Sequence, residues 1–394
     1  MLSHLTAPQA DPILSLSIAY RADPRAEKVD LGIGVYKNSQ GQTPIMAAVK
    51  QAQQRQTEQQ TSKAYVGLAG NEVFNQCMID LIVKDTSAYS RVSAIQTPGA
   101  SGALRMLGDL IKVAQPDTTV WISNPSYVNH RPVMEAAGLK VRYYQYFDPQ
   151  TRQVDSQKML QDLSCAGKND VVLLHGCCHN PTGADISLSD WKAITELAHK
   201  NGFTPFVDIA YQGFGDGLEQ DVAGVKFMAD NVEEMLITAS CSKNFGLYRE
   251  RTGAAIVVGK NQQHTDNAKG KLMTLARSTY TMPPDHGADL VATVLTDADL
   301  THTWKQELVV MQQRLVGLRT ALCQELNTTH NMDQFDFIKS HKGMFTVLGF
   351  SSQQMLQLRE DYGIYGVGDG RINIAGLQEK DIEYVANAIA TLAR

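Results

Sequence analysis

The middle of the chain alternates short apolar, β-branched runs with amphipathic segments, and this alternation constrains the fold more than any other feature. The apolar runs at residues 120–123, 171–174, 204–207, 235–238 and 254–258 predict strands. Residues 188–198 have helical spacing, begin at a Ser/Asp pair and are followed by Gly202 as a stop signal. Repeated strand, helix and strand segments predict an α/β fold with a mostly parallel central sheet that helices cover on both faces.

The C-terminal part of the chain has a different pattern. Residues 304–326 predict a long amphipathic helix, residues 343–348 and 371–374 predict strands, and Ser351 is positioned to cap a helix between them. We therefore predict a smaller α+β domain. The expected division is an N-terminal arm and part of the small domain in residues 1–44, a large domain in 45–305, and the C-terminal small domain in 306–394.

Charge and composition exclude several classes of partner. The chain of 394 residues has 36 Lys and Arg against 41 Asp and Glu, a net charge of −5, so neither nucleic acid nor an anionic membrane surface is an expected target. Its apolar runs are far shorter than the roughly 18 residues of a membrane span. The first residues lack the features of a secretory signal, and six cysteines are too sparse for a disulfide framework, which together favour the cytoplasm.

Polar residues follow the predicted strands, where an open parallel sheet binds its ligands. Asn180 follows the strand at 171–174, Asp208 and Tyr211 follow the strand at 204–207, and Lys243 follows the strand at 235–238. Residues 96–105 lead from a strand into a helix through small residues, which leaves N–H groups free to hold a phosphate.

A lysine, a carboxylate, a phenol, an amide and an anion cradle in one cleft are what a pyridoxal phosphate enzyme requires. The lysine must attach to the cofactor aldehyde and then carry a proton between carbons. The carboxylate keeps the ring nitrogen protonated, and the phenol and amide hydrogen-bond the ring oxygen. The sequence thus predicts pyridoxal 5′-phosphate as the cofactor.

Four motifs carry a resemblance that extends nearly end to end: Leu-Gly-Ile-Gly-Val-Tyr-Lys at 31–37, His-Asn-Pro-Thr-Gly at 179–183, Ser-Lys-Asn-Phe-Gly-Leu-Tyr at 242–248 and Gly-Arg-Ile-Asn-Ile-Ala-Gly at 370–376. With them, the chain resembles the class I aminotransferases of fold type I, in the aspartate and aromatic amino-acid branch. The resemblance implies the three-layer fold of that family and a small domain that closes over substrate.

The resemblance also implies the residues that hold the cofactor. Lys243 would attach to it and carry the proton, Asp208 would face the pyridine nitrogen, and Tyr211 and Asn180 would hold the ring oxygen. The implied phosphate ligands are Ser240, Arg251, Ser101 and the backbone of Ala100, joined by Tyr65 from the neighbouring subunit.

For the substrate, the resemblance implies that Arg371 grips the α-carboxylate with the N–H of Gly34 nearby. Tyr127 and Asn180 would border the substrate. Arg277 would bind a second carboxylate across the interface of a homodimer whose two sites are composite. The implied reaction moves the amino group of phenylalanine, tyrosine, tryptophan and aspartate to 2-oxoglutarate by a ping-pong route.

Two departures from the family pattern concern the cofactor site. Tyr127 stands where tryptophan usually stacks on the ring, and Ala100-Ser101 replaces the more familiar Gly-Thr. A tyrosine still offers a stacking face, so we expect altered packing with the chemistry retained.

Several alternatives remain open on the residues alone. Asp208 could be a helix cap, and Arg277 and Arg371 could be structural ion-pair partners. His175, Cys177, Cys178 and His179 lack the separated ligand arms of a structural zinc site, so we predict no metal. The alternative functions are an aspartate aminotransferase with little aromatic activity, a lyase that uses the same cofactor, and a ligand-sensing regulator on the same fold.

Overall fold

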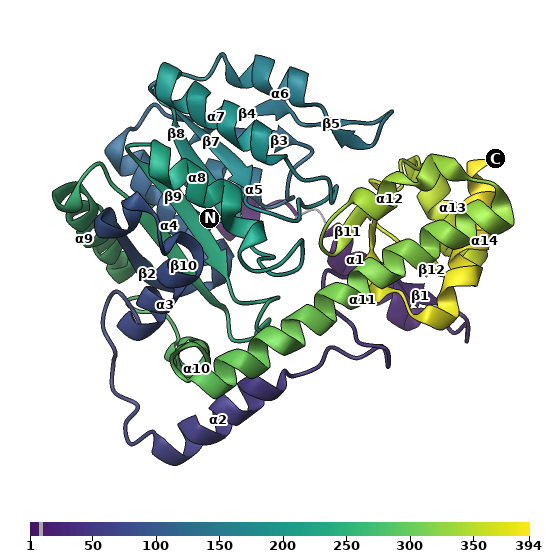
Figure 1. Cartoon of the computed structure of the whole chain (residues 1–394), viewed down its shortest axis with the longest axis horizontal. Helices are drawn as coiled ribbons and strands as arrows, with labels where there is room; N and C mark the ends of the chain where they lie inside the picture. The colour runs from purple at the N-terminus through teal and green to yellow at the C-terminus, as the bar shows by residue number, and fades with distance from the viewer. Residues whose placement is uncertain (8–10) are drawn as a thin grey trace.

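The computed structural model describes residues 1–7 and 11–394, and residues 8–10 of the predicted N-terminal arm lie outside the described part. Its main sheet has the strand order β2-β10-β9-β8-β7-β3-β4 (Figure 1). These strands are β2 (Val92–Pro98), β3 (Thr119–Asn124), β4 (Lys140–Gln145), β7 (Asp170–His175), β8 (Thr204–Ile209), β9 (Met235–Ser240) and β10 (Thr252–Val258). All five strands predicted for this region are confirmed.

The sheet is parallel except at β10, which runs antiparallel to both β2 and β9. The connection explains this exception. A parallel crossover needs a dozen or more residues, usually with a helix, whereas residues 241–251 contain no helix and turn the chain straight back. That returning loop is the segment that carries Lys243 and Arg251.

Helices cover the sheet on both faces, and further helices lie in the rest of the chain. The helices are α1 (Pro12–Ala22), α2 (Ala47–Gln59), α3 (Glu72–Val83), α4 (Gly99–Ala114), α5 (His130–Ala136), α6 (Ser156–Leu163), α7 (Leu188–Asn201), α8 (Ala223–Asn231), α9 (Gln262–Thr279), α10 (Asp285–Thr296), α11 (Ala298–His330), α12 (Phe337–Ser340), α13 (Ser352–Tyr362) and α14 (Ile382–Ala393). Among the described residues, none of them is both long and apolar enough to span a bilayer.

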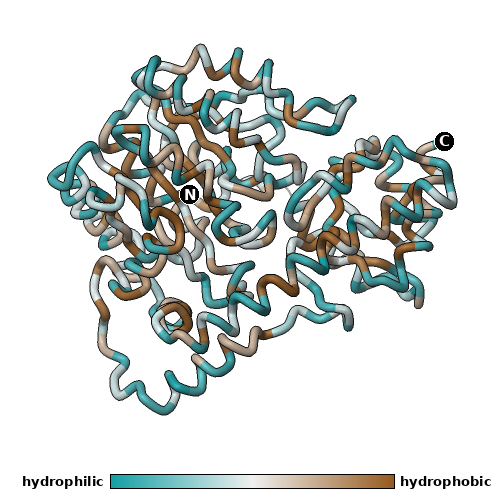
Figure 2. The backbone as a smooth tube through the Cα atoms, in the orientation of Figure 1, coloured by the Kyte–Doolittle hydropathy of each residue, from teal (hydrophilic) through white to brown (hydrophobic). Residues whose placement is uncertain are grey.

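Alternating strand residues face two different cores. In β7, Val172 and Leu174 pack with α3, α7 and α8, whereas Val171 and Leu173 pack with α4 on the opposite face. Figure 2 shows hydrophobic residues, in brown, along the strands in the middle of this part of the molecule. Because successive strand residues point to opposite faces, an uninterrupted apolar run fits a strand that is buried on both sides.

The predicted helix signals are also confirmed. The Ser187 side chain accepts from the Asp190 N–H, the Asp190 side chain accepts in return, and Gly202 ends α7 with φ +79°. Ser351 and Gln354 form the same reciprocal cap at the start of α13. Each cap satisfies N–H groups that the first helical turn leaves without partners.

A second hydrophobic core lies around the C-terminal half of α11, α13 and α14, and it includes Val29 and Leu31 from the N-terminal segment. The helix predicted at 304–326 spans residues 298–330, because Asp297 caps its start and Asn331 ends it in the left-handed region. Its first half, with Trp304, packs in the main core, and its second half, with Leu322, packs in the second core. The helix thus joins the two parts.

Two short pairings complete this smaller part. β1 (Val29–Asp30) pairs parallel with β12 (Ile364–Tyr365), and β11 (Phe345–Val347) pairs antiparallel with β13 (Arg371–Asn373). A further hairpin, β5 (Phe147–Asp148) with β6 (Gln153–Val154), lies on the large part. The strands predicted at 343–348 and 371–374 are therefore confirmed, the first at half its predicted length and the second one residue shorter than predicted.

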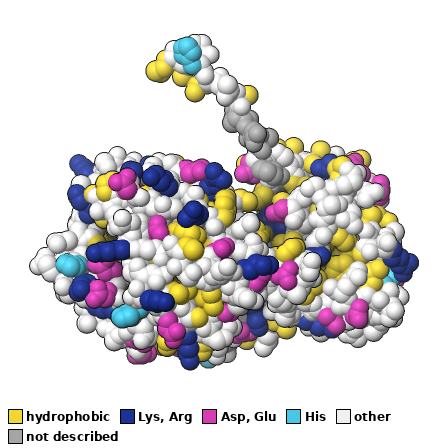
Figure 3. Space-filling model, turned by 90° about the horizontal axis from the view of Figure 1, so that it is seen from above, with side chains coloured by type: hydrophobic (Ala, Val, Ile, Leu, Met, Phe, Trp, Pro, Cys, Tyr) yellow, Lys and Arg dark blue, Asp and Glu magenta, His cyan; other side chains and the backbone are white. Residues whose placement is uncertain are grey.

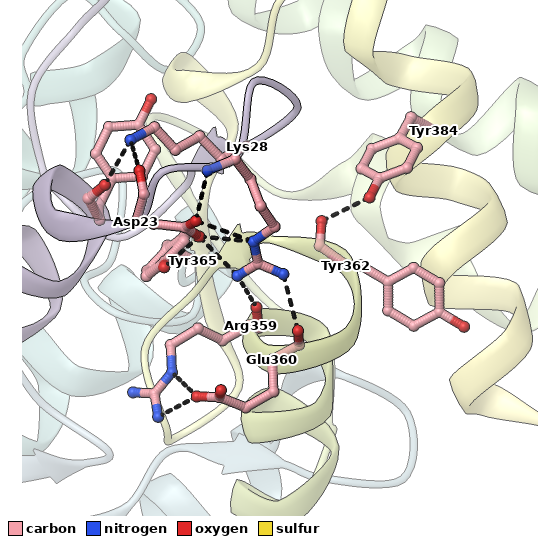
Figure 4. A network of polar contacts seen from close by, with 9 residues as sticks. Asp23, Lys28, Arg359, Glu360, Tyr362, Tyr365 and Tyr384 are labelled. Atoms are coloured by element: carbon pink, nitrogen blue, oxygen red, sulfur yellow. Dashed lines mark hydrogen bonds and ion pairs between the residues drawn. The ribbon is translucent and has the colours of Figure 1, made fainter.

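Polar contacts tie the N-terminal segment to the C-terminal part (Figure 4). Arg25 donates to the backbone oxygens of Glu360 at 2.8 Å and Arg359 at 2.9 Å. The Tyr365 hydroxyl donates to Asp23 at 2.7 Å. These contacts support the prediction that residues before 45 belong with the small domain, while the exact boundaries stay a prediction.

Candidate active site

A cavity of about 170 Å³ lies at the carboxyl ends of β7, β8 and β9, beside the start of α4. The predicted site residues that line it are Gly34, Ala100, Ser101, Tyr127, Asn180, Asp208, Tyr211, Ser240, Lys243 and Arg251. The carboxyl edge of a parallel sheet gathers these distant segments because every strand of that direction ends there.

Lys243 lies in the loop that leaves β9, with its Nζ 4.7 Å from the centroid of the Tyr211 ring. Burial lowers the pKa of Lys243 to about 8, although the negative charge of Asp208 opposes the shift. A substantial fraction of the amine is therefore unprotonated near neutral pH. Only that form acts as a nucleophile or a base.

Asp208 is buried at the end of β8 and is held by two side chains. His130 Nε2 lies 2.9 Å from one carboxylate oxygen, and the Thr238 hydroxyl donates to the other at 2.5 Å. Burial alone would raise the pKa of Asp208, but the contacts with His130 and Thr238 outweigh it and lower that pKa. The carboxyl thus stays ionised, and its bonds show that it is no helix cap.

His130 and Thr238 are site residues that the sequence interpretation missed. His130 starts α5 and is oriented by the Ser126 hydroxyl, 2.9 Å from its Nδ1. The stretch 124–127 had been singled out in the sequence, and a histidine three residues beyond it was an available signal. Its partner Asp208 is 78 residues away, however, so no local pattern links the two.

Tyr211 and Asn180 line the cavity, and Arg371 lies against Asn180. Burial raises the pKa of the Tyr211 phenol well above its usual range, so the phenol keeps its proton. Arg371 donates to Asn180 Oδ1 and to the Gly32 carbonyl, both at 3.3 Å, and lies 4.5 Å from the ring centroid of Phe345.

Arg371 is only 4% exposed, and its Nε has no hydrogen-bond partner among the described residues. A buried guanidinium held by carbonyl oxygens, with a donor left over, is a site for a planar carboxylate.

An anion cradle forms where β2 turns into α4. Gly99 has φ +70°, and a Cβ there would lie 2.5 Å from Nη2 of Arg251. Arg251 is anchored by the Tyr248 carbonyl at 3.2 Å and the Ser242 hydroxyl at 3.4 Å. The unpaired N–H groups of the first helical turn and this guanidinium together fit a phosphate.

Tyr127 lies between this cradle and Asp208. Its ring packs edge-on against His130, with centroids 5.3 Å apart. Tyr248 and His175 also line the cavity, and the Tyr248 hydroxyl accepts from the Tyr36 N–H at 3.0 Å. The sequence interpretation gave Tyr248 no role and placed His175 near the cofactor only through the family resemblance.

Three predicted site residues are not among those that line the cavity of their own chain. Arg371 lies directly behind the lining residue Asn180, whereas Tyr65 and Arg277 lie on the outside of the chain. Tyr65 is 89% exposed in the segment after α2, and Arg277 is exposed near the end of α9. Within one chain the structure does not bring either of them to the cavity.

The family model described as "Aminotransferase class I and II" matches residues 26–389. The chain belongs to this family. It is therefore an aminotransferase, as predicted.

Known proteins are similar to this aminotransferase over nearly its whole length. The aromatic-amino-acid aminotransferase of Paracoccus denitrificans is 46% identical over 99% of both chains, and the aspartate aminotransferase of Escherichia coli K12 is 40% identical over 100% of both. Among solved structures, the aromatic-amino-acid aminotransferase of Burkholderia pseudomallei covalently bound to pyridoxal phosphate has a TM-score of 0.98 and 36% identity, covering 100% of both chains. The predicted fold is confirmed.

The cavity of this aminotransferase fits pyridoxal 5′-phosphate, its predicted and now supported cofactor. The arginine and helix N-terminus suit the phosphate, the ionised Asp208 suits a protonated ring nitrogen, and Lys243 suits an aldehyde. The fit rests on donor chemistry and charge, and it covers the phosphate, the ring nitrogen and the aldehyde.

Proposed function

We propose that this aminotransferase transfers the amino group of phenylalanine, tyrosine, tryptophan and aspartate to 2-oxoglutarate by a ping-pong mechanism. One observation carries the proposal: a single cavity joins Lys243, whose pKa is lowered, to an ionised Asp208, with the buried Arg371 at its edge. The names of the Paracoccus denitrificans and Pseudomonas aeruginosa relatives, both aromatic-amino-acid aminotransferases, supply the substrate class.

We assign the cofactor contacts as follows. When bound, pyridoxal phosphate draws electrons from the α carbon of the amino acid. Asp208 holds the proton on the ring nitrogen, and Tyr211 and Asn180 hold the ring oxygen. The phosphate ligands are Ser240, Arg251, Ser101 and the backbone N–H of Ala100, and Tyr127 covers the ring face.

Lys243 is the residue that moves protons. Because its amine is partly neutral near pH 8 and lower, it would take the proton from the substrate α carbon and return it to the cofactor carbon on the other side of the transferred nitrogen. The protonated Tyr211 phenol, 4.7 Å from Nζ by its ring centroid, donates a hydrogen bond to the ring oxygen and cannot compete for the proton.

Arg371 binds the α-carboxylate of every donor, with the N–H of Gly34 nearby. Asn180 orients Arg371 through their hydrogen bond, and Phe345 covers the guanidinium face. Arg277 binds the second carboxylate of aspartate and of 2-oxoglutarate.

The position of Arg277 and Tyr65 on the outside of one chain supports a homodimer in which each subunit completes the site of the other. Apolar side chains that a partner would cover are exposed along the N-terminal region, among them Leu5, Leu14 and Ile18. Figure 3 shows the first residues standing away from the body of the chain. We place the enzyme in the cytoplasm, consistent with its free cysteines.

The test compares kcat/KM for phenylalanine and aspartate, each with 2-oxoglutarate, and follows the amino group. We expect both donors to react and glutamate to form in equal amount. Failure of phenylalanine to give a half-reaction while aspartate does would overturn the aromatic assignment, and release of ammonia without glutamate would indicate a lyase.

An aspartate aminotransferase with little aromatic activity is the second candidate. The observation that favours it is the similarity to the Escherichia coli aspartate aminotransferase over the full length of both chains, together with the retained Arg277.

A further inference from the structure

Two adjacent cysteines and one aspartate converge behind the active-site loops. The Sγ atoms of Cys177 and Cys178 and a carboxylate oxygen of Asp221 all lie within 4.8 Å of one another. All three side chains are buried, and none has a role in the transamination proposed above. Cys177 also lines the active-site cavity.

The backbone explains why neighbouring cysteines can point to one place. Side chains of consecutive extended residues point in opposite directions. Cys178, however, has φ +52°, in the left-handed region, and its thiol donates to the Tyr211 carbonyl at 3.9 Å. The Gly343 backbone packs directly against it, since a Cβ on that glycine would lie 2.4 Å from the Cys178 Cβ.

Asp221 is held rigidly and keeps spare acceptor capacity. Its two oxygens accept from the N–H groups of Gly213 at 2.8 Å, Gly215 at 3.0 Å and Asp216 at 2.7 Å. An ionised carboxylate offers about four lone-pair sites, so one remains for a further partner.

The basic side chains of this region are engaged elsewhere. Lys342 pairs with Asp216 at 2.5 Å, and Arg319 donates to the carbonyls of Gly343 and Phe345. The group of two thiols and one carboxylate thus has ligand atoms but no cation of its own.

We propose that Cys177, Cys178 and Asp221 form a binding site for one thiophilic divalent cation of the Zn²⁺ and Cd²⁺ class. Thiolates select such ions, and with metal–sulfur bonds of about 2.3 Å two thiolates on one tetrahedral ion lie about 3.8 Å apart. This spacing is inside the 4.8 Å within which the three ligand atoms lie. Binding replaces the two S–H bonds by two sulfur–metal bonds and releases two protons to solvent. Three protein ligands leave the fourth tetrahedral position for water.

The test uses the full-length holoenzyme in a Cys77→Ala/Cys165→Ala background, which removes the half-buried and the exposed thiol. Cd²⁺ alone is the probe, followed by equilibrium dialysis and by its ultraviolet thiolate-to-cadmium absorption. We expect one Cd²⁺ per chain with that absorption band. Cys177→Ala and Cys178→Ala should each abolish the band, and Asp221→Asn should weaken binding by about 10–100-fold.

Cys323→Ala is the matched control, because this buried cysteine lies alone in the second core and its loss should leave Cd²⁺ binding unchanged. Cadmium NMR of the background protein covers the case in which a variant fails to fold. A signal typical of two sulfur ligands supports the site. Absence of the band, its survival in Cys178→Ala, or a signal with one sulfur ligand or none would overturn it.

Discussion

The reactivity that we assign to Lys243 depends on the surroundings of one amine. Burial at the end of β9 removes water from the ammonium form, and the nearby Arg251 adds to this effect, while Asp208 favours the charged form. The balance brings the pKa to about 8. The same burial leaves the Tyr211 phenol protonated, so neighbouring groups have different protonation states for one physical reason.

The first prediction concerns how the apoenzyme takes up pyridoxal phosphate. Only the unprotonated amine attacks an aldehyde, so the rate of covalent attachment should rise about tenfold per pH unit below pH 8 and level off above it. Stopped-flow absorbance at several pH values measures this rate. Lys243→Ala is the control and should show neither attachment nor turnover, and a wild-type rate independent of pH across the neutral range would contradict the assignment.

The second prediction separates the two arginines. Arg371→Ala should raise KM for phenylalanine and aspartate alike by about 10–100-fold, because a hydrogen bond to a charged group contributes about 1.5–3 kcal/mol. Arg277→Ala should raise KM for aspartate and leave that for phenylalanine nearly unchanged. Steady-state kinetics with both donors decides the matter, and a similar loss for both donors in Arg277→Ala would refute its role at the second carboxylate.

At the scale of elements, the start of α4 is a segment of the site where backbone conformation and close packing restrict the residues that fit. The turn from β2 into α4 needs a left-handed residue at Gly99, and the absence of a Cβ there lets Arg251 lie against the helix N-terminus. The close approach of Gly253 to the same turn, where a Cβ would lie 2.7 Å from the Ala100 nitrogen, fixes β10 beside it. The phosphate cradle thus depends on backbone contacts between β10 and α4.

The third prediction tests this turn with a single added methyl group. Gly99→Ala should destabilise the apoenzyme by about 1–2 kcal/mol, the cost of a left-handed L-residue, and should also weaken pyridoxal phosphate binding because Arg251 is displaced. Denaturant unfolding and a cofactor titration measure the two effects. Gly270→Ala in α9, where a Cβ meets open space, is the matched control and should stabilise by about 0.5–1 kcal/mol.

At the scale of the whole molecule, the sites in one chain lack Tyr65 and Arg277. Both residues are exposed and lie away from the cavity of their own chain, and in the homodimer that we propose the two partners exchange them. In such a dimer, the activity of a site depends on which of the two subunits carries each mutation.

The fourth prediction uses two variants that are each impaired toward aspartate: Lys243→Ala, which should show no turnover, and Arg277→Ala, which should have a raised KM. In a mixed dimer, one site combines Lys243 of one subunit with Arg277 of the other and is intact, while the second site lacks both. Refolding the two variants together should therefore restore aspartate transamination in mixed dimers. Either variant refolded alone is the control, and the absence of recovery in a mixture shown to contain mixed dimers would argue against composite sites.

Much of the fold followed from local pattern. Alternating apolar and amphipathic segments identified the main strands, and Ser187, Gly202 and Ser351 marked helix ends, because caps and periodicity act over a few residues. The cofactor was predictable because strand ends in a parallel sheet converge, and the cavity there includes Lys243. The orientation of β10 was not, since it depends on the length and path of a loop that carries no periodic signal.

The sequence by itself determined which segments become strands and helices, and through its motifs the family and the cofactor. Only the tertiary structure decided that His130 and Thr238 keep Asp208 ionised, that Arg371 is buried beside Asn180, and that Cys177, Cys178 and Asp221 share one place. Secondary structure depends on neighbours within one or two turns of chain. Contacts between side chains many residues apart depend instead on the order of strands in the sheet and on how the two cores pack, which no short stretch of sequence encodes.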